Sequence, residues 1–447
     1  MAAIRLPHPL ILLVGCVFLA AILSHVFPAG EYERRLDPAS GRKVVVAGSY
    51  HAVEAHPVGF FETLVALPQG MGEAGSVIFL VFLIGGAFCV VDQTGAFHAA
   101  VHKLAQVLDG RTTLIIPLLC VVFGLGGVLE GMWEEIIALV PVLLLLGRRA
   151  GFDPLTMVAA SLGAAGIGST FSPMNPFSVG IAQKIAEIPL LSGWPFRLAV
   201  LVAGLAIWTA GTLRHAARNR VAPDDEPAAG ATRLEKKHVF ALLAVLVCFV
   251  IYIYGTLRLS WGFDEMSGLF FLMGIVVGLV GGLGLRRTAE AYVEGFRSMA
   301  YAAILIGVAR AIFVVLDRGR IVDTMIHGLV APLAHLGPGL FAVGMNCVQM
   351  IITVAVPSSS GRAILTLPIL VPMSDLLGLQ RQVTVLAYQY GAGVLGQILP
   401  TDGALMAILA LAGTNYGKWV RFAAPLCAIL FVLGVVAILA AVAIGLQ

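Results

Sequence analysis

The chain has 447 residues, of which 59% are hydrophobic and only 12% are charged, and its formal net charge is +3. Mean hydropathy is +0.96, and several segments reach the roughly 18 to 20 apolar residues that a helix needs to cross a bilayer. A soluble domain cannot bury that much apolar surface, so the composition predicts an integral membrane protein in contact with the lipid bilayer. Nucleic-acid binding is excluded, because Lys and Arg occur in short clusters rather than on one basic face.

The first apolar run, 10–27, is too long for the core of a typical signal peptide. We therefore expect an uncleaved first span with a cytoplasmic N-terminus. The polar, valine-bearing stretch that follows, to about residue 58, is expected to form a small hairpin outside the bilayer. Residues 1–58 are thus the first predicted unit, a span and an extracytoplasmic loop.

Residues 59–213 form the next predicted unit, which we call repeat 1. Two apolar arms within it are joined by the acidic stretch Glu130-Gly-Met-Trp-Glu-Glu135. The second arm is short for a full crossing, so we expect a re-entrant hairpin with its tip at mid-membrane; two tilted complete spans are the alternative. The predicted segments in order are a span at 76–91, an interfacial segment at 96–108, the hairpin at 112–147, a broken span at 155–188 and a span at 196–213.

A polar linker at 214–237 separates repeat 1 from the rest of the chain. It is rich in Lys and Arg and is therefore assigned to the cytoplasm, together with the pairs Arg148-Arg149 and Arg286-Arg287. Residues 238–285 supply two connecting spans. Repeat 2, at 286–447, is predicted to hold a span at 299–316, an interfacial segment at 321–336, a hairpin at 340–373, a broken span at 383–412 and a last span at 422–446.

The two repeats share a register of prolines and glycines. An offset of 227 positions places Pro141 on Pro368 and Pro173 on Pro400, both beside matched interruptions. The first spans of the two repeats run in opposite directions, which is the arrangement of inverted-repeat transporters. The predicted fold is an all-α polytopic membrane protein with nine spans, two re-entrant hairpins and two broken helices.

The two broken helices carry polar side chains at their breaks. A helix that stops inside a membrane leaves backbone groups unpaired, and protein or a water-filled cavity must satisfy them. Half-helix ends also attract anions at free N–H groups and cations at free carbonyls. We predict a substrate or ion site formed by Ser169, Thr170, Ser172 and Asn175 at the first break and by Gln397, Thr401 and Asp402 at the second. The alternative is that these groups only satisfy the broken backbone.

The hairpin tips differ in charge. An ionisable group at mid-bilayer costs at least about 2.5 kcal/mol, so the charged residues there are functional candidates; the alternative is a tip at the interface with solvated glutamates. Arg310, inside a predicted span, could hold a substrate carboxylate, neutralise a tip glutamate or form a structural ion pair. The tip residues are Glu130, Glu134 and Glu135 in the first hairpin and Ser358, Ser359, Ser360 and Arg362 in the second.

Enzyme motifs are absent from the sequence. It has no Walker-type phosphate loop, and the serine triplet at 358–360 has no His and Asp arrangement to activate it. We therefore predict that the protein is not an enzyme and has no cofactor other than a coupling ion.

Four stretches resemble the YfcC family of membrane carriers, which is grouped with the C4-dicarboxylate anaerobic carriers and the ArcD-type basic amino acid antiporters. They are Pro28-Ala-Gly-Glu-Tyr-Glu-Arg34, Ser172-Pro-Met-Asn-Pro-Phe-Ser-Val-Gly-Ile-Ala-Gln183, Pro357-Ser-Ser-Ser-Gly361 and Tyr416-Gly-Lys-Trp-Val-Arg421. The resemblance implies the ion-transporter superfamily fold, in which hairpin tips and broken helices frame the site of an ion- or exchange-coupled carrier. A location in the bacterial inner membrane and a homodimer are further expectations.

The second break departs from the family pattern, in which Pro-Thr is followed by a polar run ending in Ser or Asn. Here Thr401 is followed by Asp402, whose carboxylate could accept a proton or bind a cation. Coupling by H+, or by Na+ near Asn175 and Asp402, is therefore left open.

The functional prediction is secondary active transport of small carboxylate-bearing metabolites. Amino acids, in particular basic ones, come ahead of C4-dicarboxylates, because the acidic residues suit a cationic side chain whereas Arg310 and Arg362 suit a carboxylate. The alternatives are a short-chain organic acid carrier of the same fold and an ion channel or membrane scaffold.

Overall fold

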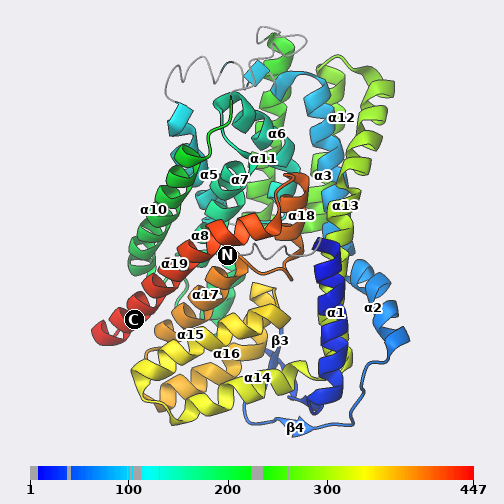
Figure 1. The fold of residues 1–447 in the computed structure, drawn as a ribbon. Helices are drawn as coiled ribbons and strands as arrows, with labels where there is room; N and C mark the ends of the chain where they lie inside the picture. Colours follow the sequence, from blue (N-terminus) through cyan, green and yellow to red (C-terminus); the bar gives the residue numbers. More distant parts are fainter. Residues whose placement is uncertain are drawn as a thin grey trace.

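The computed structural model describes residues 9–37, 42–97, 99–100, 103, 112–129, 131–222, 235–259 and 261–446. Nearly all of the regular structure is helical, as predicted (Figure 1). Within the described residues, seven helical segments are long and apolar enough to span a membrane. They lie at Gly75–Gln93, Thr112–Leu129, Trp194–Arg218, Phe263–Val280, Gly284–Arg318, Pro338–Ala355 and Tyr416–Ile444. The count of nine spans and the membrane placement of the hairpins stay predictions.

Helix α1 (Pro9–Val26) is followed by four short strands at the lower end of Figure 1. Strands β2 (Arg34–Asp37) and β3 (Arg42–Val45) form the small antiparallel hairpin that the sequence predicts. The outer strands β1 (Gly30–Glu31) and β4 (His51–Ala52) pair with each other, so the segment folds back on itself.

A group of long helices packs around α13 (Gly284–Arg318). At about 1.5 Å per residue its 35 residues extend about 52 Å, nearly the full height of the molecule (Figure 1). The sequence predicts a span at only 299–316, because the N-terminal part of this helix is polar and carries no hydropathy signal. Its neighbours include α2 (Phe60–Glu73), α3 (Gly75–Gln93), α12 (Phe263–Val280) and, beside α12, α11 (Lys236–Leu259).

Two helix pairs occupy the positions of the predicted hairpins. In the first, α5 (Ile115–Leu129) and α6 (Glu135–Ala150) flank the tip at 130–134. In the second, α15 (Pro338–Ala355) and α16 (Ser359–Leu376) flank the tip at 356–358. The remaining peripheral elements are α10 (Trp194–Arg218), α14 (Val322–Val330), the 3₁₀ helix η4 (Ala331–His335) and α19 (Tyr416–Ile444).

Both predicted helix breaks are present. The first element runs through α7 (Pro154–Val158), the π-helical η2 (Ala159–Gly163) and α8 (Ala164–Thr170), and resumes with the π-helical η3 (Pro176–Gly180) and α9 (Ile181–Ile185). The second consists of α17 (Arg381–Gly396) and α18 (Gly403–Leu411). The helix starts repeat in register, since 381 − 154 and 403 − 176 both equal 227. The inversion of the repeats stays a prediction.

Candidate functional site

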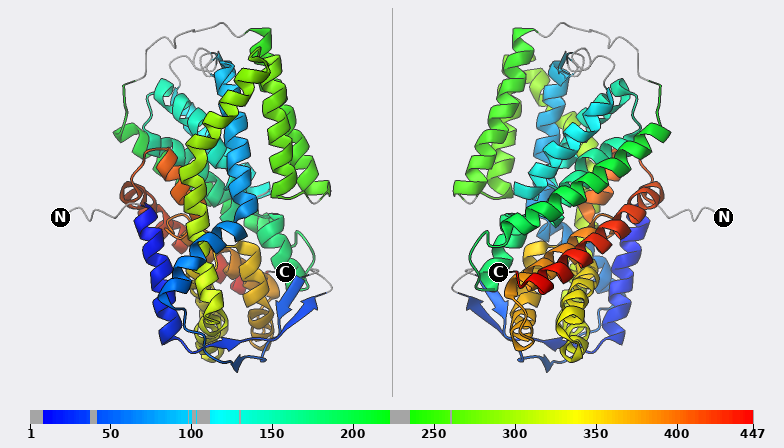
Figure 2. Two further views of the ribbon diagram at one scale, coloured as in Figure 1. Left: turned by 90° about the vertical axis from the view of Figure 1, so that its right-hand side faces the viewer. Right: turned by 90° about the vertical axis from the view of Figure 1, so that its left-hand side faces the viewer.

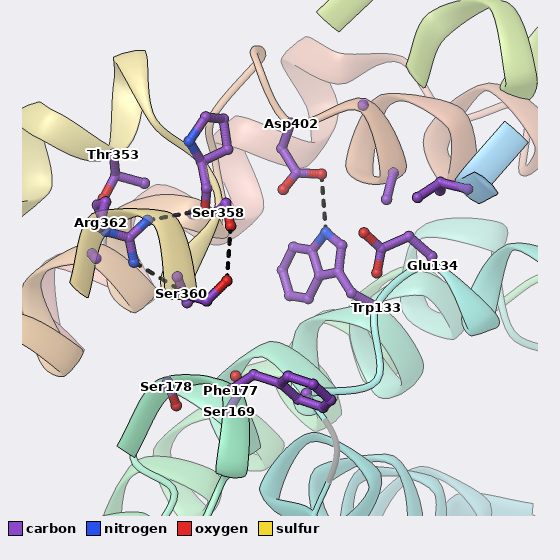
Figure 3. A pocket seen from close by; sticks show the side chains of 18 of the residues that line it. Trp133, Glu134, Ser169, Phe177, Ser178, Thr353, Ser358, Ser360, Arg362 and Asp402 are labelled. Atoms are coloured by element: carbon purple, nitrogen blue, oxygen red, sulfur yellow. Dashed lines mark hydrogen bonds between the residues drawn. The ribbon is translucent and has the colours of Figure 1, made fainter. Parts of the chain in front are cut away.

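Both hairpin tips and both helix breaks line one cavity of about 710 Å³ (Figure 3). The structure therefore brings together residues that are up to 331 positions apart in the sequence, from Glu73 to Ala404 (404 − 73). Of the predicted site residues, Glu130 lies outside the described residues and Ser172 does not line the cavity. Those that line it are Glu134, Glu135, Ser169, Thr170, Asn175, Arg310, Ser358, Ser359, Ser360, Arg362, Gln397, Thr401 and Asp402.

One wall of the cavity is acidic. Asp402 caps the N-terminus of α18 with Oδ1, which accepts from the backbone N of Leu405 at 2.8 Å and from Nε1 of Trp133 at 2.9 Å. The carboxylate of Glu134 points toward the same space (Figure 3). Glu135 accepts from the backbone N of Trp133 at 2.9 Å. The hydrogen bond from Trp133 to Asp402 thus joins the first hairpin tip to the second helix break.

The opposite wall carries hydroxyl groups and a guanidinium (Figure 3). Arg362 is 3% exposed and donates Nη1 to the carbonyl oxygens of Val356 at 3.1 Å and Pro357 at 2.9 Å. Ser358 caps α16 and lies 3.3 Å from the hydroxyl of Ser360. Within the described ranges Arg362 forms no ion pair, and its guanidinium contacts the two carbonyl oxygens, the Ser359 hydroxyl at 3.5 Å and the ring of Tyr388, whose centroid is 5.8 Å away.

At the first break the polar side chains bind mainly backbone groups, either of the break itself or of α5. Ser172 donates to the carbonyl of Val128 at 2.8 Å, and Thr170 donates to the carbonyl of Gly166 at 2.6 Å. Asn175 Oδ1 accepts from the backbone N of residues 177 and 178 at 2.9 and 3.0 Å. Asn175 Nδ2 donates to the carbonyl of residue 127 at 3.1 Å. These three side chains therefore hydrogen-bond to backbone groups of the break and of the adjacent end of α5.

Several buried polar atoms around the cavity have no hydrogen-bond partner among the described residues. They are both amide atoms of Gln397, the Thr401 hydroxyl, the Gln389 Oε1 atom, the Ser178 hydroxyl and Nε of Arg362. Buried polar groups in native proteins are almost always hydrogen-bonded, so these atoms are available to a ligand or ordered water. Gln389, Ser178 and Trp133 were not among the predicted site residues, although Trp133 lies in the predicted tip and Gln389 in the predicted second broken helix.

Arg310 forms an ion pair, but its partner is Glu73 and not a glutamate of the first hairpin tip. Its Nε donates to Oε2 of Glu73 at 2.9 Å, and its guanidinium lies 4.8 Å above the ring of Phe313. Glu73 ends α2 and itself lines the cavity. The sequence gives no signal for this pair, whose members are 237 positions apart.

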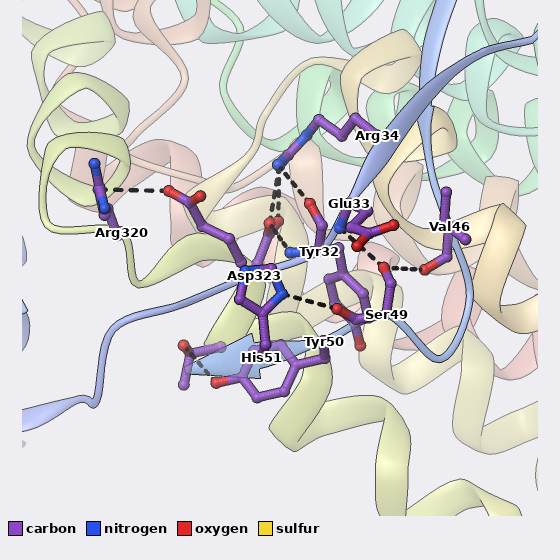
Figure 4. Close-up of polar contacts among 11 residues, drawn as sticks. Tyr32, Glu33, Arg34, Val46, Ser49, Tyr50, His51, Arg320 and Asp323 are labelled. Atoms are coloured by element: carbon purple, nitrogen blue, oxygen red, sulfur yellow. Dashed lines mark hydrogen bonds and ion pairs between the residues drawn. The ribbon is translucent and has the colours of Figure 1, made fainter. Parts of the chain in front are cut away.

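A second cavity, of about 430 Å³, is also lined by the second hairpin tip. The two cavities share the lining residues Arg310, Phe313, Pro357, Ser358 and Ser360. Charged side chains from the strand segment, Glu31 and Arg34, line the second cavity. Figure 4 shows the polar contacts of Arg34.

The expected Na+ near Asn175 and Asp402 stays a prediction. Among the described residues, no group of three or more His, Cys, Asp and Glu side chains is placed to hold a metal ion. The side-chain oxygen of Asn175 already accepts two hydrogen bonds, whereas Oε1 of Gln397 and Oγ1 of Thr401 are unpartnered. Unpartnered side-chain oxygen atoms therefore lie at both breaks, with Ser178 at the first and Gln397 and Thr401 at the second.

Apolar helices enclosing a polar cavity at two matched breaks indicate a membrane transporter. The family model for DcuC, the C4-dicarboxylate anaerobic carrier, matches residues 6–443. The chain therefore belongs to this family of transporters, and it is not an enzyme, as the sequence predicts.

Two curated relatives match most of the chain. The chain is 30% identical to the "Putative basic amino acid antiporter YfcC" of Escherichia coli (strain K12), over 98% of this chain and 97% of that protein, which confirms the resemblance noted above. It is 29% identical to an "Uncharacterized protein" of Haemophilus influenzae, over 88% of this chain and 80% of the relative.

Two solved transporter structures align with nearly the whole chain. The YdaH transporter of Alcanivorax borkumensis gives a TM-score of 0.45 at 16% identity, with 98% of this chain and 99% of that chain covered. MtrF of Neisseria gonorrhoeae gives a TM-score of 0.44 at 17% identity, with 99% and 96% covered.

Proposed function

We propose that the protein is a secondary active transporter of small carboxylate-bearing metabolites, with amino acids, in particular basic ones, ahead of C4-dicarboxylates. The observation that carries this proposal is the division of charge in the large cavity. Trp133, Glu134 and Asp402 lie on one wall, and Ser358, Ser360 and Arg362 lie on the other (Figure 3).

The acidic wall needs a positive partner. Glu134, Glu135 and Asp402 form no ion pair with Lys or Arg in the described part of the chain, because Arg310 is held by Glu73 and Arg362 by tip carbonyls. Burial of unpaired charge costs several kcal/mol per ion, so protons, a metal cation or a cationic substrate must neutralise these groups. A basic amino acid would place its cationic side chain here and its carboxylate near Arg362.

A C4-dicarboxylate is the second candidate, because the description of the family model names such carriers. One of its carboxylates would suit Arg362 and the serine hydroxyls. The other would face Glu134 and Asp402, so binding would require protons or cations on that wall. A short-chain organic acid avoids this conflict, since it has a single carboxylate.

Counterflow in proteoliposomes tests the proposal. Purified protein is reconstituted with internal unlabelled substrate, and uptake of labelled arginine, ornithine, fumarate and butyrate is measured. We expect saturable counterflow of the basic amino acids and its loss in Glu134→Gln, with the exposed Arg286→Gln as control. Absence of counterflow with all four would contradict carrier function, and non-saturating conductance would indicate a channel.

We further propose coupling by H+ bound on the acidic wall, by Na+ at the second break or by exchange, in the inner membrane of a bacterium with the N-terminus in the cytoplasm. A homodimer is also proposed. Imposed pH and Na+ gradients in the same proteoliposomes distinguish the coupling modes, and light scattering in detergent gives the oligomeric state.

A further inference from the structure

We propose that Trp133 is a specificity-determining residue, whose indole ring forms, together with Glu134 and Asp402, the subsite for the cationic end of the substrate. This inference rests on the proposed function, because it requires a cationic substrate. It adds a residue that composition and charge did not single out.

Two hydrogen bonds fix the position of Trp133. Its backbone N donates to Oε2 of Glu135 at 2.9 Å, and its indole Nε1 donates to Oδ1 of Asp402 at 2.9 Å. One bond holds the main chain of the tip and the other holds the edge of the ring. The ring is therefore oriented before any substrate arrives.

A glycine leaves room for the ring. A Cβ atom placed on Gly166 would lie 2.5 Å from the Trp133 ring and 1.8 Å from Nε2 of Gln397, so both side chains lie against the α8 backbone. Trp133 is only half-buried and lines the cavity, into which its ring projects below Asp402 (Figure 3).

The chemistry of this wall favours a cation. The face of an indole carries negative charge density and attracts ammonium and guanidinium groups more strongly than other aromatic rings do. Oδ1 of Asp402 is already occupied by two donors, which leaves Oδ2 for a ligand. Oε1 of Gln397 and Oγ1 of Thr401 are additional acceptors without a partner in the described ranges. A neutral ligand of the same shape gains little from the ring and the carboxylates.

The competing explanation is that Trp133 only ties the first hairpin tip to the second break. The two explanations differ in selectivity. Loss of a structural tie weakens transport of every substrate by a similar factor, whereas loss of a cation subsite weakens transport of cationic substrates alone. Arginine and its neutral isostere citrulline form a matched substrate pair for this comparison.

The experiment measures KM for arginine and citrulline in proteoliposomes containing wild type, Trp133→Phe, Trp133→Leu or the control Trp194→Phe. Trp194 is 52% exposed and does not line the cavity. We expect Trp133→Leu to raise KM for arginine about 10-fold and for citrulline less than about 2-fold, with Trp133→Phe intermediate. An equal change for both substrates, or no change for either, would overturn the inference.

Failure of the proposed function is recognised separately, from the wild type alone. If wild-type protein neither transports arginine nor binds it in calorimetry, the proposed substrate class is wrong and this inference falls with it. If wild type transports arginine and the arginine-to-citrulline ratio of Trp133→Leu is unchanged, only the subsite is rejected. Thermal unfolding of each purified variant shows whether it is folded. If Trp133→Leu does not fold, the comparison is made with Trp133→Phe.

Discussion

Asp402 combines a structural and an electrostatic role in one side chain. Its Oδ1 caps α18, and the carboxylate adds charge to the acidic wall of the cavity. Asn caps helices about as well as Asp, whereas Ala loses the cap at a cost of about 1 kcal/mol. We therefore predict that Asp402→Asn keeps wild-type thermal stability but changes the pH dependence of transport, and that Asp402→Ala loses both stability and transport. Normal transport by Asp402→Asn at every pH tested would show that Asp402 does not accept the coupling proton.

Gly166 provides a second test at the residue scale. A methyl group at this position would meet the ends of two side chains, Gln397 and Trp133, rather than backbone. Side-chain ends can move, so we predict that Gly166→Ala folds but raises KM for substrate several-fold by displacing both. Gly268→Ala is the control, because a Cβ there meets nothing within 4 Å. An unchanged KM would show that the displaced groups do not contact substrate.

Most of the site residues predicted from the sequence line the cavity, but the sequence does not predict the role of each. Polar residues at the two breaks were recognisable because polarity is rare inside an apolar run. Whether Asn175 binds backbone or ligand depends on the local turn, in which its Oδ1 accepts from residues 177 and 178. The pairing of Arg310 with Glu73 depends on how distant helices meet, which no local pattern encodes.

At the scale of elements, glycines set how closely the first broken helix lies against the first hairpin. A Cβ on Gly168 of α8 would lie 2.0 Å from the carbonyl oxygen of Gly124 in α5. Backbone cannot yield as a side chain can, so we predict that Gly168→Ala lowers stability by about 1 to 3 kcal/mol. Comparison of its yield and thermal unfolding with those of Gly166→Ala, two residues away, checks this. Equal stability of the two variants would contradict the close contact.

The strand segment is fastened to α14 by a polar cluster (Figure 4). Arg34 binds Asp323 at 2.9 Å, and Asp323 is only 3% exposed. The Tyr32 hydroxyl oxygen lies 3.0 Å from Nδ1 of His327, and the rings of Tyr50 and His327 stack with their centroids 4.1 Å apart. We predict that Arg34→Ala increases hydrogen exchange over residues 30–52, because the Asp323 carboxylate loses its charged donor, and that Arg34→Lys restores part of the protection. Unchanged exchange in Arg34→Ala would show that the apolar contacts suffice.

The Tyr32 phenol adds a pH limit to this cluster. Burial, together with the charges of Asp323 and Tyr50, raises the pKa of Tyr32 to about 12. A raised pKa means that the folded state favours the neutral phenol. The phenol's contribution to the free energy of unfolding is therefore complete below the ordinary pKa of about 10 and is lost as the pH rises through 12. The Tyr32 hydroxyl therefore stays protonated at any physiological pH.

Helix boundaries show what hydropathy can detect. The starts of both halves of both broken helices repeat in the 227-residue register that the prolines indicated. The polar first half of α13 escaped prediction, because Tyr292 and Gly295 of that part pack against α12 and α3 without an apolar run.

For the whole molecule, the structure places the basic segments together. Arg220, at the start of the linker, donates to the carbonyl of Ala150 at 2.9 Å, next to Arg148-Arg149. The start of α13 lies toward the same end in Figure 1, and the strands lie at the other. We predict that cysteines at positions 222 and 286 are labelled from one side of the membrane and a cysteine at position 54 from the other, in a background without the six native cysteines. Labelling of 222 and 286 from opposite sides would refute the topology.

The two cavities share the second hairpin tip, through Pro357, Ser358 and Ser360, and the neighbouring Arg310 and Phe313. A carrier dissipates its driving gradient as soon as one continuous aqueous path crosses it. If both cavities belong to that path, the free energy that holds this tip in place limits the leak through each molecule. A substitution that destabilised the tip would then lower the membrane potential before it reduced substrate uptake.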